Sequence, residues 1–339
     1  MNVFHLLSNN SLVASGILFY VVLGCISNNS SISSAHDLPL SFATEKIITH
    51  QTTFLLSLRG GDQSVSESEA STSNKDESRT MYNKQASNWS RTEPRCLSDF
   101  TGRPVVFSML EPHISGATVL DVGCGEGYCA RKVRDMGAAY IVGSDISEEM
   151  VKCASDVAIA QGTQSQFYYY TASSTNLLEG LDSERKKEGL QLVIPKHFDV
   201  AMAVFLFNYL TTGEMLETMS QVYAALKPGG IFVFSVPHPS MIYCHDEDAI
   251  FRLESNGKGY FSSRNEKILG QISTIDGTKL NIMSVHKTVG DYFDTILKAG
   301  FEILEVKEAA VTREHMEMNP EFFSSVYDRP LHLVFKIRK

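Results

Sequence analysis

Residues 119–127 read VLDVGCGEG, an apolar run that passes into three closely spaced glycines. The apolar part predicts a buried strand, and the helical spacing of Ala130, Val133 and Met136 predicts a helix directly after the glycines. Glycine has no Cβ and tolerates positive φ, so this turn lets the backbone approach a ligand closely. The helix that follows presents unpaired N–H groups to the same ligand. The pattern therefore predicts a strand–turn–helix ligand site.

A second predicted strand, residues 140–145, ends in Asp145, which could accept both hydroxyls of a ribose and indicates a nucleoside-containing cofactor. The glycines do not match the dinucleotide fingerprint, because Tyr128 stands where its third glycine would be. Asp121 precedes the first glycine by two residues, and its carboxylate would repel a pyrophosphate. It suits a cationic ligand that carries an amino group and a sulfonium. These features favour S-adenosylmethionine over NAD.

Four segments in this order resemble the class I S-adenosylmethionine-dependent methyltransferases: 121–127 (DVGCGEG), 143–150 (GSDISEEM), 198–203 (FDVAMA) and 226–230 (LKPGG). The resemblance covers about residues 81–339. It implies an α/β fold with a doubly wound, seven-stranded, mostly parallel sheet whose last strand is antiparallel, with helices on both faces. It also implies an enzyme that transfers a methyl group from S-adenosylmethionine.

The resemblance further implies a set of cofactor-binding residues. Asp121, Gly123 and Gly125 would line the methionine end, Asp145 would hold the ribose, and Ile146 and Met150 would pack against the adenine. The family often places an acid after the third strand; residues 171–177 contain none, and Ser173 is the expected substitute. The remaining predicted cofactor residues are Cys124, Val204 and, from the leading segment, Tyr82. Trp89 and Arg91 are further candidates to close over the cofactor, although a helix that docks Trp89 into the core is an equally good reading.

His238 is the candidate catalytic residue. It lies between Pro237 and Pro239 after the predicted fifth strand, and the prolines restrict the backbone around it. A histidine there could take the proton of the methyl acceptor, since its unperturbed pKa lies near neutrality. The alternative is a histidine that orients a loop or is hydrogen-bonded for structure. His245 is a weaker rival, and Asn208 and Tyr209 could either face the ligands or pack.

Strand and helix patterns alternate from residue 118 onward, which favours a parallel sheet covered by helices. The predicted strands are 118–122, 140–145, 166–171, 198–205, 231–236, 302–309 and 331–337, and the predicted helices are 127–136, 148–161, 213–226 and 289–299. Two segments fall outside this alternation. Residues 81–114 would form an N-terminal helical cap, and residues 240–287 a lid-like insert, with a hairpin turning at Asp276-Gly277.

The N-terminal part has a different character. Residues 12–26 are apolar but short of the roughly 20 residues that span a membrane. Residues 1–35 therefore resemble a signal peptide or signal anchor, residues 36–80 a disordered linker or transit segment, and residues 81–339 the methyltransferase domain. The five cysteines beyond the leader form no C-x-x-C pair, which argues against a metal site and favours a reducing compartment. The leader would direct the protein into the secretory route, and onward transport to a plastid-like organelle would reconcile the leader with the free cysteines. The alternative is a membrane anchor with the domain facing the cytosol.

The net charge of −9 and the lack of a basic stripe argue against a nucleic-acid partner. A small-molecule methyl acceptor is therefore the expected partner, without a stable transmembrane span. A protein or RNA methyltransferase and a non-catalytic S-adenosylmethionine-binding factor are the alternatives; the intact Asp121 and Asp145 argue against the second. The sequence leaves open whether oxygen, nitrogen or sulfur is methylated, and it does not indicate an oligomeric state.

Overall fold

Seven strands form one sheet in the order β3-β2-β1-β4-β5-β10-β9 in a computed structural model that describes residues 67–187 and 193–339. Their bounds are β1 Thr118–Val122, β2 Tyr140–Asp145, β3 Phe167–Thr171, β4 Phe198–Val204, β5 Leu226–Pro237, β9 Glu302–Ala309 and β10 His332–Arg338. Strand β10 runs antiparallel to β5 and β9, and the pairs among β3, β2, β1, β4 and β5 are parallel. The predicted fold class is confirmed, including the antiparallel last strand. The predicted leader and most of the predicted linker lie outside the described residues.

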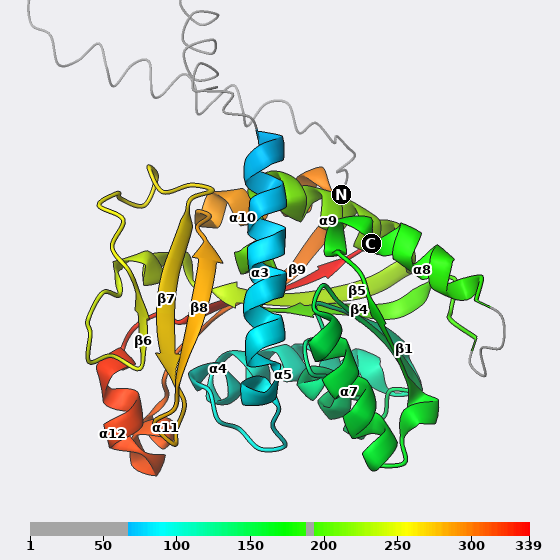
Figure 1. The fold of residues 1–339 in the computed structure, drawn as a ribbon, viewed down its shortest axis with the longest axis horizontal. Helices are drawn as coiled ribbons and strands as arrows, with labels where there is room; N and C mark the ends of the chain where they lie inside the picture. Colours follow the sequence, from blue (N-terminus) through cyan, green and yellow to red (C-terminus); the bar gives the residue numbers. More distant parts are fainter. Residues whose placement is uncertain (1–66, 188–192) are drawn as a thin grey trace, which may run out of the picture. The chain divides into compact units, whose positions relative to one another are not determined.

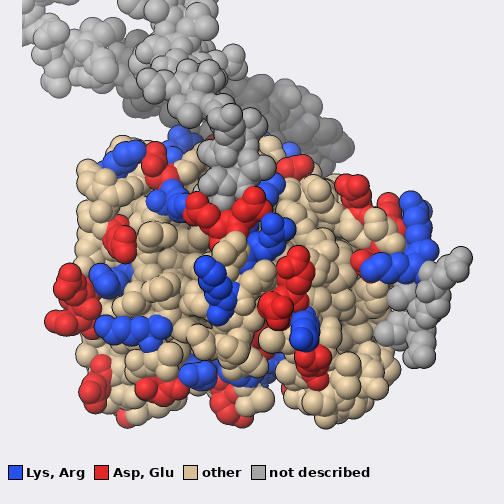
Figure 2. All heavy atoms as spheres, viewed as in Figure 1, with Lys and Arg blue, Asp and Glu red and all other residues tan. Residues whose placement is uncertain are grey.

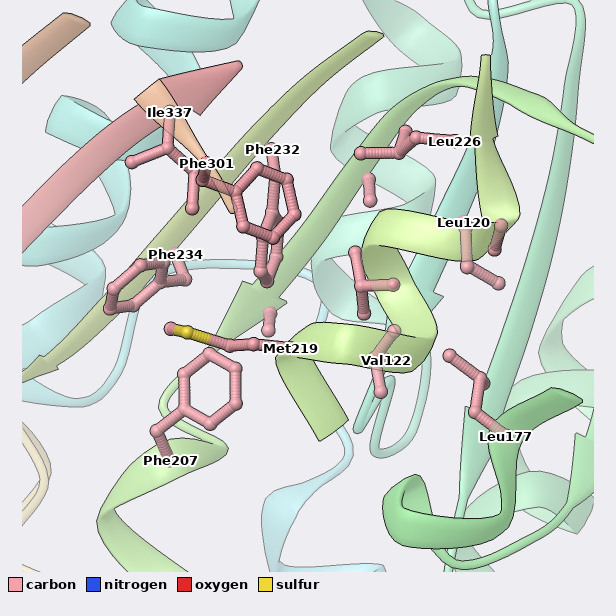
Figure 3. Close-up of a cluster of buried hydrophobic side chains, with 14 of the residues drawn as sticks. Leu120, Val122, Leu177, Phe207, Met219, Leu226, Phe232, Phe234, Phe301 and Ile337 are labelled. Carbon is pink, nitrogen blue, oxygen red and sulfur yellow. The ribbon is translucent and has the colours of Figure 1, made fainter. Parts of the chain in front are cut away.

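Helices cover both faces of this sheet (Figure 1). One face packs against α5 (Gly102–Ile114), α6 (Tyr128–Asp135) and α7 (Glu148–Ala160), and the other against α8 (Leu177–Arg185), α9 (Thr212–Ala225) and α10 (Val289–Lys298). Side chains alternate between the faces of a strand. In β1, Val119 therefore packs in a first hydrophobic cluster on the face of α5, α6 and α7. Leu120 packs in a second cluster on the face of α8, α9 and α10. Figure 3 shows the second cluster, where Met219 of α9 meets Phe232 and Phe234 of β5.

The insert forms a second, three-stranded antiparallel sheet of β6 (Phe251–Leu253), β7 (Lys267–Ser273) and β8 (Lys279–Val285). The predicted hairpin is present between β7 and β8, where Gly277 at its turn has a φ of 81°. The short helices are α4 (Leu97–Phe100), α11 (Arg313–Met318), α12 (Pro320–Phe323) and the 3₁₀ turns η1 (Gln164–Gln166), η2 (Ser174–Asn176), η3 (Phe207–Tyr209), η4 (Pro239–Tyr243) and η5 (Ser324–Val326).

Helix α3 (Glu67–Trp89) lies between the β7–β8 hairpin and α7 (Figure 1). The helix begins at Glu67, so residues 67–80 of the predicted linker are helical and the predicted domain start at Met81 falls inside the helix. Residues 67–80 contain one apolar residue, Ala70, so the periodicity of this half gave no helix signal. Polar contacts hold its first half instead: Lys75 Nζ lies 3.0 Å from Thr175 Oγ1 and 3.4 Å from Glu214 Oε1. Among the described residues, no helix is both long and apolar enough to cross a membrane.

Candidate active site

A cavity of about 210 Å³, partly open to solvent, lies where β1, β2 and β4 end. Its walls come from the glycine turn, the ends of these strands, α3 and the insert. All ten predicted cofactor residues line it: Tyr82, Asp121, Gly123, Cys124, Gly125, Asp145, Ile146, Met150, Ser173 and Val204. Residues that are far apart in the sequence therefore meet around one space.

The glycine turn has the backbone that its sequence predicted. Gly123, Gly125 and Gly127 have φ values of 75°, 54° and 83°, in the region that favours glycine. The N–H groups of Gly123 and Cys124 both donate to Ser144 O, at 2.8 and 2.9 Å, and tie the turn to β2. A Cβ placed on Gly125 would meet no atom within 4 Å. The turn is therefore fixed at its base and open where a ligand could approach.

Asp121 presents an unsatisfied buried oxygen. Its residue is 1% exposed, and its Oδ2 atom has no hydrogen-bond partner in the described part of the chain. Burial, with a smaller contribution from the charge of Asp145, raises the pKa of Asp121 to about 8, against the opposing charge of Arg103. Buried polar atoms are almost always paired. Asp121 therefore suits a cationic ligand that supplies the missing partner and ionises the carboxyl group.

Asp145 is held by the backbone. Its Oδ2 accepts a hydrogen bond from Gly125 N and its Oδ1 accepts one from Ser147 N, each at 2.9 Å. Burial raises the pKa of Asp145, and these hydrogen bonds act in the opposite direction. A carboxylate oxygen can accept more than one hydrogen bond. Both oxygens thus remain able to accept the hydroxyl groups of a ribose.

Helix α3 closes one side of the cavity. The hydroxyl groups of Tyr82 and Tyr209 form a hydrogen bond, and their rings meet edge to face at 5.5 Å. The Tyr82 ring also lies 5.9 Å from that of Trp89. On the other side of the helix, Asn83 Oδ1 accepts a hydrogen bond from Ser147 Oγ at 2.6 Å. The helix is thereby tied to η3 and to the N-terminus of α7.

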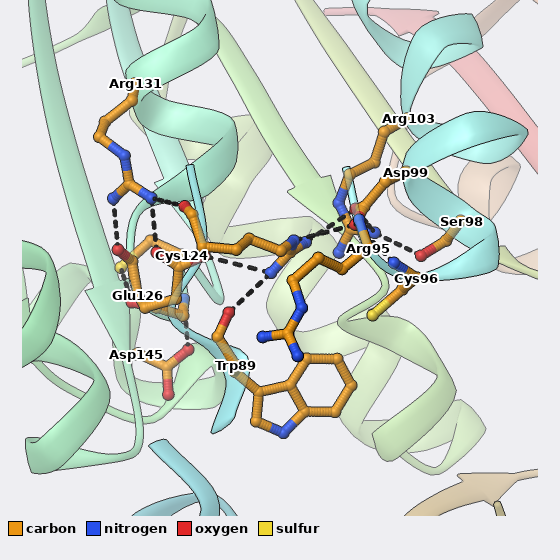
Figure 4. Close-up of polar contacts among 12 residues, drawn as sticks. Trp89, Arg95, Cys96, Ser98, Asp99, Arg103, Cys124, Glu126, Arg131 and Asp145 are labelled. Atoms are coloured by element: carbon orange, nitrogen blue, oxygen red, sulfur yellow. Dashed lines mark hydrogen bonds and ion pairs between the residues drawn. The ribbon is translucent and has the colours of Figure 1, made fainter. Parts of the chain in front are cut away.

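A buried ionic network anchors the glycine turn (Figure 4). Arg91 donates to Asp99 at 3.0 and 2.8 Å and to Glu126 Oε1 at 3.2 Å. Arg131 donates to Glu126 Oε2 at 2.6 Å, and Arg103 donates to Asp99 Oδ1 at 3.0 Å. Arg91 lines the cavity, as Trp89 does, and its guanidinium is held by Asp99 and by Glu126 of the glycine turn. Sequence reasoning missed Asp99, Glu126 and Arg103. The one available signal was Glu126, a charged residue inside a glycine turn that was predicted to follow a buried strand.

His238 does not line the cavity. Its Nδ1 lies 2.7 Å from Ser240 Oγ and accepts a hydrogen bond from Ser240 N at 3.2 Å, while its Nε2 lies 2.9 Å from Glu308 Oε1. Both ring nitrogens are thus engaged in the loop after β5 and at β9. This geometry agrees with the structural alternative for His238 and does not support a role as proton acceptor. His245 also lies outside the cavity wall, with Nδ1 2.9 Å from Leu253 O.

His332 lines the cavity instead, at the start of β10. It is 4% exposed, its Nε2 lies 2.9 Å from Thr101 Oγ1, and its Nδ1 has no partner in the described ranges. Sequence reasoning missed it, although a histidine within an apolar strand was a signal. Asn208, a candidate from sequence, also lines the cavity, and its Oδ1 lacks a described partner. No group of three or more His, Cys, Asp or Glu in residues 67–187 and 193–339 could hold a metal ion.

Comparison with known proteins gives a family and several relatives. A family model described as a methyltransferase domain matches residues 100–281. An uncharacterised protein of Haemophilus influenzae is 26% identical over 253 residues, which are 74% of this chain and 91% of that protein. A ribosomal protein L11 methyltransferase of Neisseria meningitidis serogroup B is 33% identical over 122 residues, 36% of this chain and 32% of that protein. The fold resembles the CcbJ methyltransferase of Streptomyces caelestis with a TM-score of 0.50, 16% identity, and coverage of 77% of this chain and 96% of that one.

Proposed function

Because this chain belongs to the class I S-adenosylmethionine-dependent methyltransferases, we propose that it transfers the methyl group to a small molecule bound in the cavity beneath α3. The observation that carries this proposal is that two segments outside the seven-stranded sheet, α3 and the insert, contribute apolar side chains to the cavity wall. Tyr82 and Trp89 come from α3, and Ile272, Ile282 and Met283 come from the insert. Apolar pockets with a few placed polar groups are typical of small-molecule sites.

The residues of the cavity fit the cofactor. The unpaired Oδ2 of Asp121 would meet the positively charged methionine end, and the open side of Gly125 admits the ligand against the backbone. Asp145 would hold the ribose through oxygens that the backbone already orients. Ile146 and Met150 would pack against the adenine, with Ser173 beside it. Cys124, Val204 and Gly123 would complete the contact surface.

The chemistry needs alignment more than activation. The bound cofactor supplies a methyl group that its sulfonium already activates. The protein therefore has to hold the acceptor atom in line with that methyl group and to exclude water. Helix α3 and the insert wall would exclude water, and the ionic network beneath the glycine turn would keep the turn fixed.

The closure by α3 gives a testable effect. Tyr82→Phe removes the hydrogen bond to Tyr209, and a net hydrogen bond is worth about 1 kcal/mol. Roughly a fivefold weaker binding of S-adenosylmethionine is expected by calorimetry. Tyr243→Phe is the control, because Tyr243 is exposed and does not line the cavity. Equal affinities of all three proteins would contradict a closing role for Tyr82.

A protein or RNA acceptor is the competing proposal, supported by the similarity to a ribosomal protein L11 methyltransferase. The charge pattern argues against RNA. On the face shown in Figure 2, Lys and Arg are interspersed with Asp and Glu and form no stripe. A nucleic-acid backbone is normally bound by a clustered basic surface.

The acceptor class can be tested with the full chain and S-adenosylmethionine labelled in the methyl group. Cell extract would be separated into small molecules, protein and RNA before each fraction is added. Label transferred to the small-molecule fraction is the expected result, and Asp121→Asn is the control that should abolish it. Label transferred to protein or RNA alone would overturn the small-molecule proposal, and no transfer to any fraction would favour the non-catalytic alternative.

A further inference from the structure

We propose that His332 accepts a hydrogen bond through its Nδ1 atom from a hydroxyl group of the methyl acceptor, so that the enzyme is an O-methyltransferase. The inference rests on the proposed function, since it assigns a role in the same cavity. Sequence reasoning did not single out this residue, and His238, the histidine that it did single out, lies outside the cavity wall.

The hydrogen bonds of Thr101 determine the tautomer of His332. The Thr101 hydroxyl donates its single hydrogen to Leu97 O, at 2.9 Å. In its 2.9 Å contact with His332 Nε2 the hydroxyl must therefore act as the acceptor. Nε2 carries the proton, and Nδ1 of the neutral ring carries a lone pair. The side chain is thus prepared to accept a hydrogen bond.

That lone pair has no partner within the described chain, although the residue is 4% exposed. An unpaired acceptor at this depth is uncommon in a folded protein. Because His332 lines the cavity, a bound molecule can supply the donor. The missing partner is therefore a donor group, such as a hydroxyl, on the ligand.

The surroundings hold the ring in place. The ring of Phe205 lies 5.0 Å from that of His332, and Phe205 has a φ of 60°, a conformation that non-glycine residues rarely adopt. A Cβ on Gly102 would lie 2.8 Å from His332 Cδ2 and 3.0 Å from Phe205 Cζ. Strained and tightly packed positions of this kind gather at functional sites. The packing thus fixes the direction of the imidazole.

The charged and titratable neighbours are Arg103 on α5 and His238 at the end of β5, which is itself paired with Glu308 of β9. Burial lowers the pKa of His332 to about 3, and the charges of Arg103 and His238 add to the effect. The ring therefore stays neutral above that range, and its lone pair stays available. A base this weak can take a proton only from a strong acid.

Oxygen methylation produces such an acid. A lone pair of the hydroxyl oxygen forms the new bond to the methyl carbon, and the carbon–sulfur bond breaks with its electrons remaining on sulfur. The oxygen becomes positively charged, and its O–H proton passes to Nδ1 of His332, which becomes an imidazolium. A methylated amine would be far less acidic and would keep its proton, and a thiol is a weak donor to Nδ1. Oxygen is therefore the acceptor atom that matches this histidine.

Three variants distinguish the role of Nδ1 of His332 from that of Nε2, and the role of His332 from that of His238. His332→Gln can still donate to Thr101 but has no acceptor in the Nδ1 position, whereas His332→Asn places an amide oxygen near that position. Phenol is the probe, and aniline is its matched amine. With saturating cofactor, kcat for phenol is expected to fall by about tenfold in His332→Gln, which loses the hydrogen bond that orients the hydroxyl group, and to recover in part in His332→Asn. His238→Gln is the matched control and should stay within about twofold of the wild type.

Cofactor affinity by calorimetry should be unchanged in all three variants, which separates loss of the histidine from loss of the fold or of the proposed function. Methylation of aniline but not phenol, or equal kcat in His332→Gln and wild type, would overturn the inference and leave the proposed function standing. Absence of S-adenosylmethionine binding in the wild type would overturn the proposed function itself.

Nitrogen-15 NMR of the histidine rings tests the ground state directly. His332 is expected to be neutral and protonated on Nε2 down to about pH 5. Phenol, added with S-adenosylhomocysteine, should shift the Nδ1 resonance of His332 and leave that of His238 unchanged. A proton found on Nδ1, or a His332 resonance that phenol does not move, would overturn the inference.

Discussion

Asn in place of Asp121 should weaken S-adenosylmethionine binding by roughly 30-fold or more, because truncating a buried charge pair costs about 2–5 kcal/mol. The variant keeps the size of the side chain and one acceptor oxygen, replaces the other oxygen by an amide donor and removes the charge. Asp121 is buried and its Oδ2 has no described partner, so the substitution breaks no described hydrogen bond of that oxygen in the ligand-free protein. Calorimetric titration of the full chain measures the effect, and wild-type affinity in the variant would contradict the assignment of the methionine end.

The raised pKa of Asp121 makes this binding depend on pH. In the ligand-free protein the carboxyl group has a pKa of about 8, so it is mostly protonated near neutral pH. A cationic ligand binds the ionised form, and up to one proton is therefore released. Affinity should rise by up to about tenfold per pH unit until pH reaches this pKa, and then level off. Titrations in buffers of different ionisation enthalpy count the proton, and Asp121→Asn should release none.

The same shift predicts a change in stability. The folded-state pKa lies above the unfolded value, so the protonated carboxyl group is favoured by folding, and this contribution is lost as pH rises from about 4 to about 8. Asp121→Asn should remove that loss and raise the free energy of unfolding of the ligand-free protein above about pH 7. The variant is therefore a poor binder that folds well, which separates a binding defect from an unfolding defect.

Replacing Glu126 by Gln should destabilise the protein by about 3 kcal/mol, because it leaves Arg91 and Arg131 buried without their shared carboxylate. All three side chains are 8% exposed or less. The free energy of unfolding from urea denaturation measures the loss. Because Glu126 belongs to the glycine turn, cofactor affinity should fall together with stability.

Glu266→Gln is the matched control for Glu126. Glu266 pairs with Lys258 at 2.8 Å, but both side chains are nearly half exposed, at 46% and 45%. Exposed ion pairs contribute about 0–1 kcal/mol. Equal losses in the two variants would show that burial of the Glu126 network is not what stabilises the turn.

The strands and the main helices could be predicted because their signals are local. Apolar runs correspond to strands in which successive side chains point to opposite faces of the sheet. Val119 and Leu120, for example, belong to the hydrophobic clusters on the two faces. The glycine turn was equally readable, since its positive φ values require the residue type that the sequence shows. Eight of the ten cofactor residues that line the cavity follow from motifs at strand ends, whereas Met150 lies on α7 and Tyr82 on α3.

The rest depends on contacts between distant residues. The first half of α3 has no apolar stripe and is held by partners such as Thr175, 100 residues away. The choice between His238 and His332 was also beyond the sequence, because the contact that orients His332 joins residues 231 positions apart. Two prolines beside His238 were a strong local pattern, but they shape a loop whose histidine turns toward Ser240 and Glu308.

Calorimetric titration of the full chain with S-adenosylmethionine and, separately, with NAD tests the central claim most directly. The unpaired Asp121 carboxyl group beneath an open glycine turn predicts micromolar binding of S-adenosylmethionine and no binding of NAD, whose pyrophosphate that carboxylate would repel. Binding of NAD in place of S-adenosylmethionine would contradict the account of this site.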